Sequence, residues 1–589
     1  MAHHDRSFET TLHDVVYSID VGTGLKIIRV ALFVLFILLI SMIYVATQFR
    51  GLNNAEAMDY AQLGRNFSLN GGMVTKCVRP LTVWKASGRN PENDAHFYDH
   101  PDLFHPPVYP AVLSAGFRIF EALGLDPFDM SRQARFVTMP AEQWIVIPFN
   151  QIFAMLTGWL LYSLGKRLFT REIALLGVIA YFTSKLIWAD VISGLNVTMA
   201  GFFVLAAFRS MVVAMLNRRD RTSKWKWMTA FFFSIVFASA AFLTRYIAIA
   251  AVPGILLFAW LMGGGFRGGT RFVLVFSLLF AVMAAPWFYR NYKVCGNPFG
   301  MTLETALVDT AQYPDRLLER QLSPDFEKKG PLIDQVKKKW GENLARRHPA
   351  ALLGMGGGIL LAFFVTALFY RFVRPPVNYL QWGVWFSLLL TLLIAGFFSG
   401  SSFRMLHAYW PFIVLYGLAF FYILLDRLDM GVRLYALALK IGIVALGAVP
   451  LIMTVFVAPH VKVPYPPYYP PAVKSLSDML NEREIMCTDM PWATAWYGNR
   501  VSLLLPLSVD DFLAVNDEKH YVSAIYLTPI TKDKPFLSSL LKGSDKDWLP
   551  FMGGRIPEDF PLQAVVALNQ NDQVFISDRN RWGGGENPE

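Results

Sequence analysis

An unbroken run of apolar residues, VALFVLFILLISMIYVAT, occupies positions 30–47. At 1.5 Å per helical residue, a run of this length crosses about 30 Å of hydrocarbon. Ten similar runs follow it, so the sequence predicts eleven membrane-spanning helices. The later runs are Trp144–Leu164, Ile173–Ala189, Leu195–Leu216, Trp227–Leu243, Tyr246–Met262, Phe272–Phe288, Leu352–Tyr370, Leu380–Phe398, Leu406–Leu425 and Ile441–Val457.

The composition agrees with a polytopic α-helical membrane protein. Of the 589 residues, 54% are hydrophobic and only 17% are charged, which exceeds the apolar content of ordinary soluble domains. The three cysteines are too few for a disulfide framework or a repeated metal motif. The net charge of +10 would suggest a nucleic-acid partner in a soluble chain, but here membrane topology must be considered first.

The short loops between the apolar runs differ sharply in charge. With a cytoplasmic N-terminus, fourteen basic residues fall on inner loops, whereas the opposite short loops, near Asp190, Arg245 and Arg404, hold one or none. This asymmetry sets the orientation and explains much of the positive charge without any nucleic acid. The fourteen are Lys166, Arg167, Arg171, Arg218, Arg219, Arg221, Lys224, Lys226, Arg267, Arg271, Arg371, Arg374, Arg427 and Arg433.

This orientation divides the chain into three predicted parts. Residues 1–26 form a polar cytoplasmic N-terminus. Residues 27–457 form the transmembrane domain, with long outer loops at 48–143 and 289–351. Residues 458–589 lie outside the membrane, where short β-rich runs alternate with helix-like ones and predict a small α/β domain.

Acidic residues follow the first span directly. In AEAMDYAQLGRN, residues 55–66, Glu56 and Asp59 are three positions apart and share one face of a predicted helix. A carboxylate that lipid partly desolvates can accept a proton from a hydroxyl. A solvated acid near the start of a helix is the alternative interpretation, and the pattern alone leaves both open.

A histidine- and proline-rich segment, HPDLFHPPVYP, occupies residues 100–110. Its prolines fix the entry to Tyr109–Leu123, a short charged stretch that predicts an interfacial helix. His105 is held beside them, either within reach of an anionic group or as a helix-capping residue. The prolines impose no metal-ligand geometry on His100, Asp102 and His105, so we predict no metal site.

Basic residues recur at predicted outer helix ends. They are Arg245 in LTRYIAI, Arg290 in PWFYRNY, and Arg404 with His407 in SSFRMLHAYWPF. Each alone is typical of an interfacial anchor. Arginine pairs bidentately with phosphate, however, so a convergent group would suit a lipid-linked phosphate at the outer leaflet.

Other basic residues of the outer loops carry weaker signals. Arg65, Lys76 and Arg79 could contact an acceptor, but without a specific signal they are expected on the solvated surface. The segment PLIDQVKKKWGENLARRHP, residues 331–349, predicts a helix whose basic face, including Lys339, rests on anionic lipid headgroups.

These segments, in this order, resemble the GT-C superfamily of membrane glycosyltransferases, in particular its bacterial protein-mannosyltransferase-like and aminoarabinose-transferase-like branch. The resemblance covers residues 26–457. Its elements are AEAMDYAQLGRN, HPPVYP, ISGL, LTRY, PWFYRNY with GNPF, and an Arg-containing segment before a Pro-bearing late helix.

The resemblance implies a hexosyl- or pentosyltransferase of the bacterial inner membrane, with a GT-C-like fold and an active site facing the periplasm. The donor would be a polyprenyl-phosphate sugar, and the acceptor hydroxyl would belong to a glycan, a lipid or a protein. Transfer would invert the sugar carbon and require no metal or other cofactor. The expected partners are these substrates and membrane lipids, and not nucleic acid.

The resemblance also implies site residues. The catalytic base would be Glu56 or Asp59. Many members of the family carry an Asp-Glu pair a few residues before a Tyr-Ala dipeptide. When that dipeptide is aligned with Tyr60-Ala61, Glu56 takes the position of the Asp and Ala57 takes the position of the Glu. His105 stands where some relatives carry Lys, and Asn196 where some carry an acid. The donor phosphate is expected at His105, Arg290, Arg404 and His407, and further substrate contacts at Tyr60, Arg65 and Arg245.

A transporter or flippase of lipid-linked sugars is the main alternative function. It predicts ionisable residues near the bilayer midplane and broken helices in matching halves of the chain. The apolar runs hold almost no charges in their central parts, and this favours the enzyme.

Overall fold

A computed structural model describes residues 23–87, 97–130, 138–221, 223–324, 329–353, 358–428, 433–457, 468–532, 541–543, 545–568 and 573–582. Within these residues, eight helices are long and apolar enough to cross a membrane. They are α2 (Thr23–Gln48), α6 (Ile147–Leu168, preceded by η2, Glu142–Val146), α9 (Val197–Arg219), α10 (Lys224–Thr244), α12 (Gly269–Cys295), α16 (Pro375–Ala395), α17 (Trp410–Arg427, preceded by η7, Gly400–Tyr409) and α18 (Arg433–Ile452, followed by η8, Met453–Val457).

The other three predicted spans are helical, but each is either bent or too short to count as a single long apolar helix. Helices α7 (Arg171–Phe182) and α8 (Lys185–Ile192) form one pair bent by 51°. The remaining two spans are shorter apolar helices: η3 with α11 (Tyr246–Ala250, Ala251–Met262), and α15 (Gly358–Ala367). The predicted polytopic helical membrane fold is therefore confirmed. The predicted N-terminal segment 1–26 lies mostly outside the described residues.

The first outer loop folds onto the bundle through two helices, α3 (Ala55–Asn70) and α5 (Val108–Ala122). The predicted helix at Tyr109–Leu123 is present as α5. Its buried residues Tyr109, Leu113 and Phe117 face α3, and Gly64 of α3 approaches so closely that a Cβ there would lie 2.9 Å from Leu113. Close packing against α5 therefore fixes the position of α3.

The C-terminal part is an α/β unit around a six-stranded sheet of order β1-β3-β2-β4-β6-β5. Strands β1, β3, β2 and β4 are parallel to one another, whereas β6 runs antiparallel to both β4 and β5. Its elements are α19 (Pro470–Asp478), β2 (Ile485–Thr488), α20 (Pro491–Tyr497), β3 (Ser502–Leu504), α21 (Val509–Glu518), β4 (Val522–Leu527), α22 (Pro529–Lys532), η9 (Lys546–Trp548), α24 (Leu549–Met552), β5 (Ala564–Leu568) and β6 (Gln573–Ser577).

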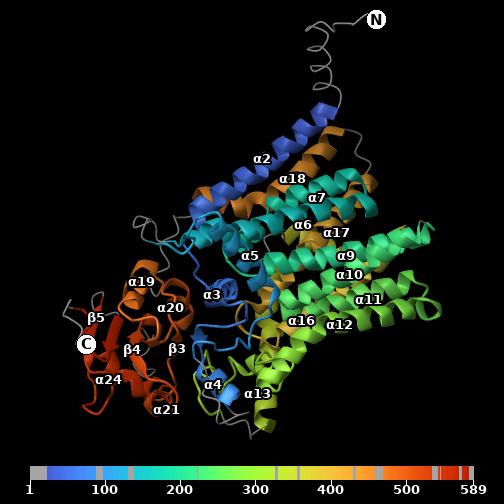
Figure 1. The fold of residues 1–589 in the computed structure, drawn as a ribbon. Coiled ribbons are helices and arrows are strands. Elements are labelled where there is room, and N and C mark those ends of the chain that lie inside the picture. Colours follow the sequence, from blue (N-terminus) through green and yellow to red (C-terminus); the bar gives the residue numbers. More distant parts are fainter. Residues whose placement is uncertain are drawn as a thin grey trace, which may run out of the picture.

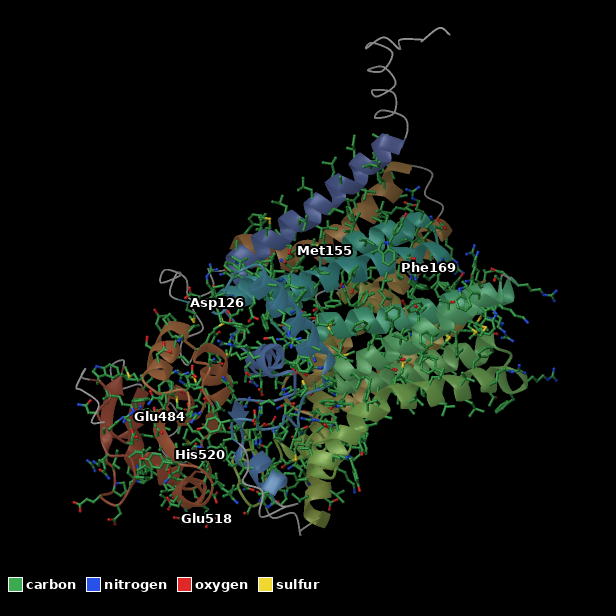
Figure 2. All side chains as sticks on the ribbon, viewed as in Figure 1. Asp126, Met155, Phe169, Glu484, Glu518 and His520 are labelled. Atoms are coloured by element: carbon green, nitrogen blue, oxygen red, sulfur yellow. The ribbon has the colours of Figure 1, made fainter. Side chains whose placement is uncertain are left out.

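Strand β1 (Cys77–Val78) comes from the first outer loop and pairs with β3, so the sheet is built from two distant parts of the chain. In Figure 1 the sheet lies beyond one end of the helical bundle, with α3 between them. Figure 2 shows Glu484, Glu518 and His520 in this unit, well apart from Met155 and Phe169 in the bundle. Strand β1 continues into α4 (Pro80–Ser87).

The second outer loop connects the bundle to this sheet. Arg320 donates from Nε to Leu505 O (2.8 Å) and forms an ion pair with Asp545 (2.5 Å). The loop also contains η5 (Glu304–Leu307), α13 (Lys329–Glu342), η6 (Asn343–Arg347) and α14 (His348–Leu353). The prediction that Lys339 faces lipid headgroups is wrong: its Nζ is buried and donates to the carbonyls of Ala306 and Val308. Burial lowers the pKa of Lys339 to about 8.

Helices α11 and α16 pack backbone to backbone at two glycines. A Cβ on Gly254 would lie 2.1 Å from Gly383 O, and one on Gly383 would lie 2.6 Å from Gly254 O. Small residues permit this approach between membrane helices. Because Arg245 lies just before η3, which leads into α11, this contact helps to fix the position of its guanidinium.

We expect Gly254→Ala to lower stability by about 1–3 kcal/mol, because its methyl group meets rigid backbone atoms. The matched control is Gly201→Ala, whose Cβ meets Ala408 at an ordinary 3.5 Å. Thermal unfolding of the two purified variants checks this. Equal unfolding midpoints would contradict the assigned close approach.

Candidate functional site

The two acids of α3 occupy different environments. Asn54 caps the helix by accepting a hydrogen bond from the backbone N–H of Glu56 (2.9 Å), which places Glu56 in the first turn. The Glu56 side chain is 29% exposed, whereas that of Asp59 is 2% exposed. A substrate can therefore reach Glu56 far more easily than Asp59.

Glu56 belongs to a network centred on Arg245. Arg245 lies 3.2 Å from Glu56 and donates to Ser401 Oγ (2.7 Å), and Ser401 in turn donates to Glu56. Arg245 also donates to Asn196 Oδ1 (2.6 Å), and Asn196 donates to the hydroxyl of Tyr60 (2.9 Å). The amide of Asn196 thus links Arg245 to Tyr60 without adding charge. Three predicted residues, Glu56, Tyr60 and Arg245, therefore lie together.

Asp59 forms a buried ion pair with Arg79 (2.5 Å) and accepts a hydrogen bond from Gln62 (2.9 Å). Arg79 is also paired with Glu319 of the second outer loop (3.1 Å). The prediction that Arg79 lies on the solvated surface is wrong. Its partners come from separate parts of the sequence, so no local pattern around Arg79 reveals them.

His105 lies between two carboxylates. Its Nδ1 is 3.0 Å from Asp102 Oδ1, its backbone N–H donates to Asp102 Oδ2 (2.8 Å), and its Nε2 is 3.8 Å from Asp59. Burial opposes the imidazolium, but Asp102 and Asp59 outweigh burial and raise the pKa of His105. The ring also meets Tyr60 edge-on, with centroids 4.6 Å apart.

Arg290 joins the same group from the outer end of α12. It donates to the backbone carbonyls of Asp102 (2.5 Å) and Met73 (3.2 Å), and its guanidinium lies over the Trp287 ring. Asp102 therefore contacts His105 through its carboxylate and Arg290 through its carbonyl oxygen. These two predicted phosphate ligands form one cationic pair.

Arg404 and His407 form a second pair around Asp190. Their distances to its carboxylate are 3.4 Å and 2.6 Å. Both lie on η7, and because residues three apart in a 3₁₀ helix eclipse one another, Ser401, Arg404 and His407 share one face. The four predicted phosphate ligands thus form two separate pairs.

Arg65 lies apart from these groups. Its Nη1 points to the carbonyl of Trp496 in α20 (3.5 Å), and its guanidinium covers the Phe128 ring. Burial lowers the pKa of Arg65 to about 10. The predicted substrate-binding residue therefore contacts the C-terminal unit.

Seven residues of these hydrogen-bond and ion-pair networks had no predicted catalytic or phosphate-binding role: Gln62, Arg79, Asp102, Asp190, Asn196, Glu319 and Ser401. One sequence signal did exist for Ser401, because Ser401, Arg404 and His407 recur at intervals of three. This spacing matches a 3₁₀ helix, but a short run of that kind is seldom assigned from sequence.

Sequence comparison identifies one family model in this chain. The model described as dolichyl-phosphate-mannose-protein mannosyltransferase matches residues 135–289, a region that includes Asn196 and Arg245. No curated protein sequence matches the chain.

Solved structures with this fold include ArnT from Cupriavidus metallidurans and the oligosaccharyltransferase AglB from Archaeoglobus fulgidus. Apo ArnT matches with a TM-score of 0.55 and 13% identity, covering 95% of this chain and 99% of ArnT. ArnT bound to undecaprenyl phosphate matches with a TM-score of 0.56 and 12% identity over the same shares. AglB in complex with an inhibitory peptide and a dolichol-phosphate matches with a TM-score of 0.53 and 12% identity, covering 87% of this chain and 71% of AglB.

Together with the family model, these matches confirm the predicted resemblance to the GT-C superfamily. The identities are low, so the solved structures establish the fold: a multi-pass membrane bundle with an appended unit.

We expect Asp59→Asn to lower the free energy of unfolding by about 3–5 kcal/mol, because Arg79 would lose its buried carboxylate partner and keep only the half-buried Glu319. Thermal or denaturant unfolding of the purified protein measures this. Glu121→Gln, an exposed site on α5, is the control. Wild-type stability in Asp59→Asn would contradict the assigned ion pair.

The stability contribution of His105 should depend on pH. Its folded-state pKa is raised above the ordinary value of about 6.5. The contribution is therefore complete below about pH 6.5 and is lost as pH rises through the folded-state pKa. The difference in unfolding midpoint between wild type and His105→Gln should accordingly shrink as pH rises above about 6.5. A difference that grows with pH would show that the neutral ring is the stabilising form.

Proposed function

We propose that this protein is a GT-C glycosyltransferase that moves a sugar from a polyprenyl-phosphate donor to an acceptor hydroxyl at the outer membrane face. The observation that carries this proposal is the partly exposed Glu56, connected through Arg245, Asn196 and Tyr60 to the cation His105. The likeness to ArnT, which was solved with undecaprenyl phosphate, supports a lipid-linked donor.

Glu56 is the proposed base, and Asp59 has a structural role. A general base must come within hydrogen-bond reach of the proton that it removes. Glu56 is 29% exposed, whereas Asp59 is 2% exposed and one of its oxygens forms the buried ion pair with Arg79. Taking Asp59 as the base would require Arg79 to lose a buried partner, at a cost of several kcal/mol.

The donor phosphate would meet His105 and Arg290. Fixed positive charge placed where negative charge develops is often the largest catalytic contribution. His105 carries its charge because Asp102 and Asp59 flank the ring, and Arg290 is held by backbone carbonyls that leave its charge unneutralised.

The reaction would proceed by displacement at the anomeric carbon. The acceptor oxygen forms a bond to that carbon while the carbon–oxygen bond to phosphate breaks, and the electron pair remains on the phosphate oxygen. The acceptor proton passes to the Glu56 carboxylate. A single displacement of this kind inverts the configuration of the sugar carbon.

We expect Glu56→Gln to lower the transfer rate by at least about 100-fold, because the amide cannot accept the proton. The assay offers radiolabelled undecaprenyl-phosphate hexoses and pentoses one at a time, with the cell-envelope fraction as acceptor. The full-length protein is used throughout.

Glu121→Gln, which is exposed on α5, is the matched control and should retain wild-type activity. The unfolding midpoint of Glu56→Gln should fall less than that of Asp59→Asn, because Glu56 is partly solvated whereas Asp59 is buried. Full activity in Glu56→Gln would refute the base assignment. Absence of transfer from every donor by wild-type protein would refute the proposed donor class.

A further inference from the structure

Three basic residues converge where the first outer loop meets the C-terminal unit: Arg65 on α3, Lys76 just before β1, and Arg500 between α20 and β3. We call them the junction cluster. Lys76 Nζ donates to the carbonyl (3.1 Å) and the side-chain oxygen (2.7 Å) of Asn499, which directly precedes Arg500. The charges of Arg65 and Arg500 both act on Lys76, and that of Arg500 also acts on Arg65. The three side chains are therefore close neighbours.

The positive charge of the junction cluster is not neutralised by direct contacts. Among the residues that the structure describes, no carboxylate forms an ion pair with any of its three members. Glu121, Asp126 and Glu482 act on it from further away, and all three are exposed. In Figure 2, Asp126 lies between the bundle and the C-terminal unit. Like charges held together at a half-buried position are unfavourable unless an anion joins them.

Each member of the junction cluster also keeps N–H groups that the described part of the chain does not use. Arg65 makes one long hydrogen bond, from Nη1 to Trp496 O (3.5 Å), and its buried Nε has no partner there. The Arg500 guanidinium donates only from Nε, to two backbone carbonyls (3.1 Å each). Lys76 uses two of its three N–H groups. All three residues are partly exposed, so a ligand can reach them.

The junction cluster is separate from the proposed catalytic site. Arg65 lies nine residues beyond Glu56 on α3, which is about two and a half helical turns or about 13 Å along the axis. The two side chains therefore project from opposite faces of the helix. Helix α20 packs against α3 and ends three residues before Arg500. An anion bound at the junction cluster would not contact Glu56.

The junction cluster lies near the level of the outer membrane surface. In α20, the indole of Trp496 donates to Glu142 (2.9 Å), the residue at which the span containing α6 begins. The neighbouring Tyr497 hydroxyl donates to Leu52 O (3.4 Å), just beyond the end of α2. Two contacts thus hold α20 at the outer ends of membrane helices. Lipid phosphates occupy the interfacial layer at this level.

We propose that the junction cluster binds a phosphate group, carried by a lipid headgroup of the outer leaflet or free in solution. Guanidinium groups pair bidentately with phosphate oxygens, and an ammonium adds a point charge. Two guanidiniums and one ammonium therefore suit a phosphate, which would join the first outer loop to the C-terminal unit. This site goes beyond the proposed function, which assigns the donor phosphate to His105 and Arg290.

The test measures binding of inorganic phosphate to the full chain by isothermal titration calorimetry. The protein is kept in dodecyl maltoside micelles, which contain no phosphate. We expect Arg65→Gln/Lys76→Gln to weaken phosphate binding at the junction cluster at least about tenfold, because two charge-assisted contacts are lost. His105→Gln, which alters the donor site proposed above, should leave binding at the junction cluster unchanged.

Lys542→Gln/Arg555→Gln is the matched control. It removes one lysine and one arginine, both exposed in the C-terminal unit, and so changes the net charge by the same amount. Its phosphate affinity should equal that of wild type. An equal loss of affinity in this control would show that net charge alone attracts phosphate and would overturn the inference. Unfolding midpoints for every variant show whether a lost affinity reflects lost structure.

The charge-preserving variant Lys76→Arg tests the site without removing a cation. Burial and the charges of Arg65 and Arg500 lower the pKa of Lys76 to about 8, and only Glu482 opposes them. Lys76 therefore loses its charge as pH rises above about 8. Affinity for sulfate, whose own charge is constant in this range, should fall roughly tenfold between about pH 7 and about pH 9 in wild type. Lys76→Arg should keep its affinity, and equal decreases in both proteins would contradict the inference.

Phosphatidic acid, whose headgroup is a phosphate monoester, identifies the source of the phosphate. Native mass spectrometry of the same samples counts the lipid molecules that each protein retains. Lower retention by Arg65→Gln/Lys76→Gln than by the matched control would assign the site to a lipid headgroup, and an effect on inorganic phosphate alone would assign it to a soluble phosphate. Unchanged binding of both probes in Arg65→Gln/Lys76→Gln would overturn the inference. Phosphate binding lost only in His105→Gln would do so too, while leaving the proposed function intact.

Discussion

The buried ion pair between Arg79 and Asp59 is the contact on which the outer half of the molecule depends. Arg79 directly follows β1, Asp59 lies on α3, and the second partner of Arg79, Glu319, lies in the second outer loop. One guanidinium therefore connects the sheet, the first outer helix and a loop some 240 residues away. Because such a pair repays its desolvation only with good geometry, it restrains all three segments at once.

This restraint explains why two acids on one helix differ so much. Fixing Asp59 against Arg79 sets the rotation of α3, and Glu56, three residues earlier, is then directed toward Arg245 and Ser401. The same rotation brings Tyr60 against His105. Asp59 is buried against a guanidinium and out of reach of a substrate, whereas the same rotation of α3 leaves Glu56 partly exposed.

The sequence predicts the membrane part well, because each span carries its own signal. An apolar run of 17 residues or more is a local property, and loop charges add the orientation. Strand β1 illustrates the limit: two residues, Cys77 and Val78, contain no periodicity, and only their pairing with β3 makes them a strand. The burial of Arg79, which directly follows this strand, could not be predicted from the sequence for the same reason.

The grouping of charged residues was less predictable than their identity. The sequence identifies His105 as basic beside two prolines, and Arg290, Arg404 and His407 as basic at predicted outer helix ends. Which of them converge depends on two carboxylates, Asp102 and Asp190, and on the rotation of the elements that carry them. Sequence spacing specifies such rotation only within one element, as in the interval of three along η7.

The 3₁₀ geometry of η7 places the residues that contact Glu56 and Asp190 on one edge of the same segment. In an α-helix, residues at intervals of three drift around the axis, so Ser401 and His407 would face different neighbours. With three residues per turn they stay aligned, and one edge of η7 contacts both Glu56 and Asp190. A 3₁₀ segment of ten residues is longer than usual, and its hydrogen bonds are poorer than those of an α-helix. Side-chain hydrogen bonds and ion pairs to Glu56, Arg245 and Asp190 compensate for these poorer backbone hydrogen bonds. The alignment of Ser401 with His407 is therefore maintained by the residues that they contact.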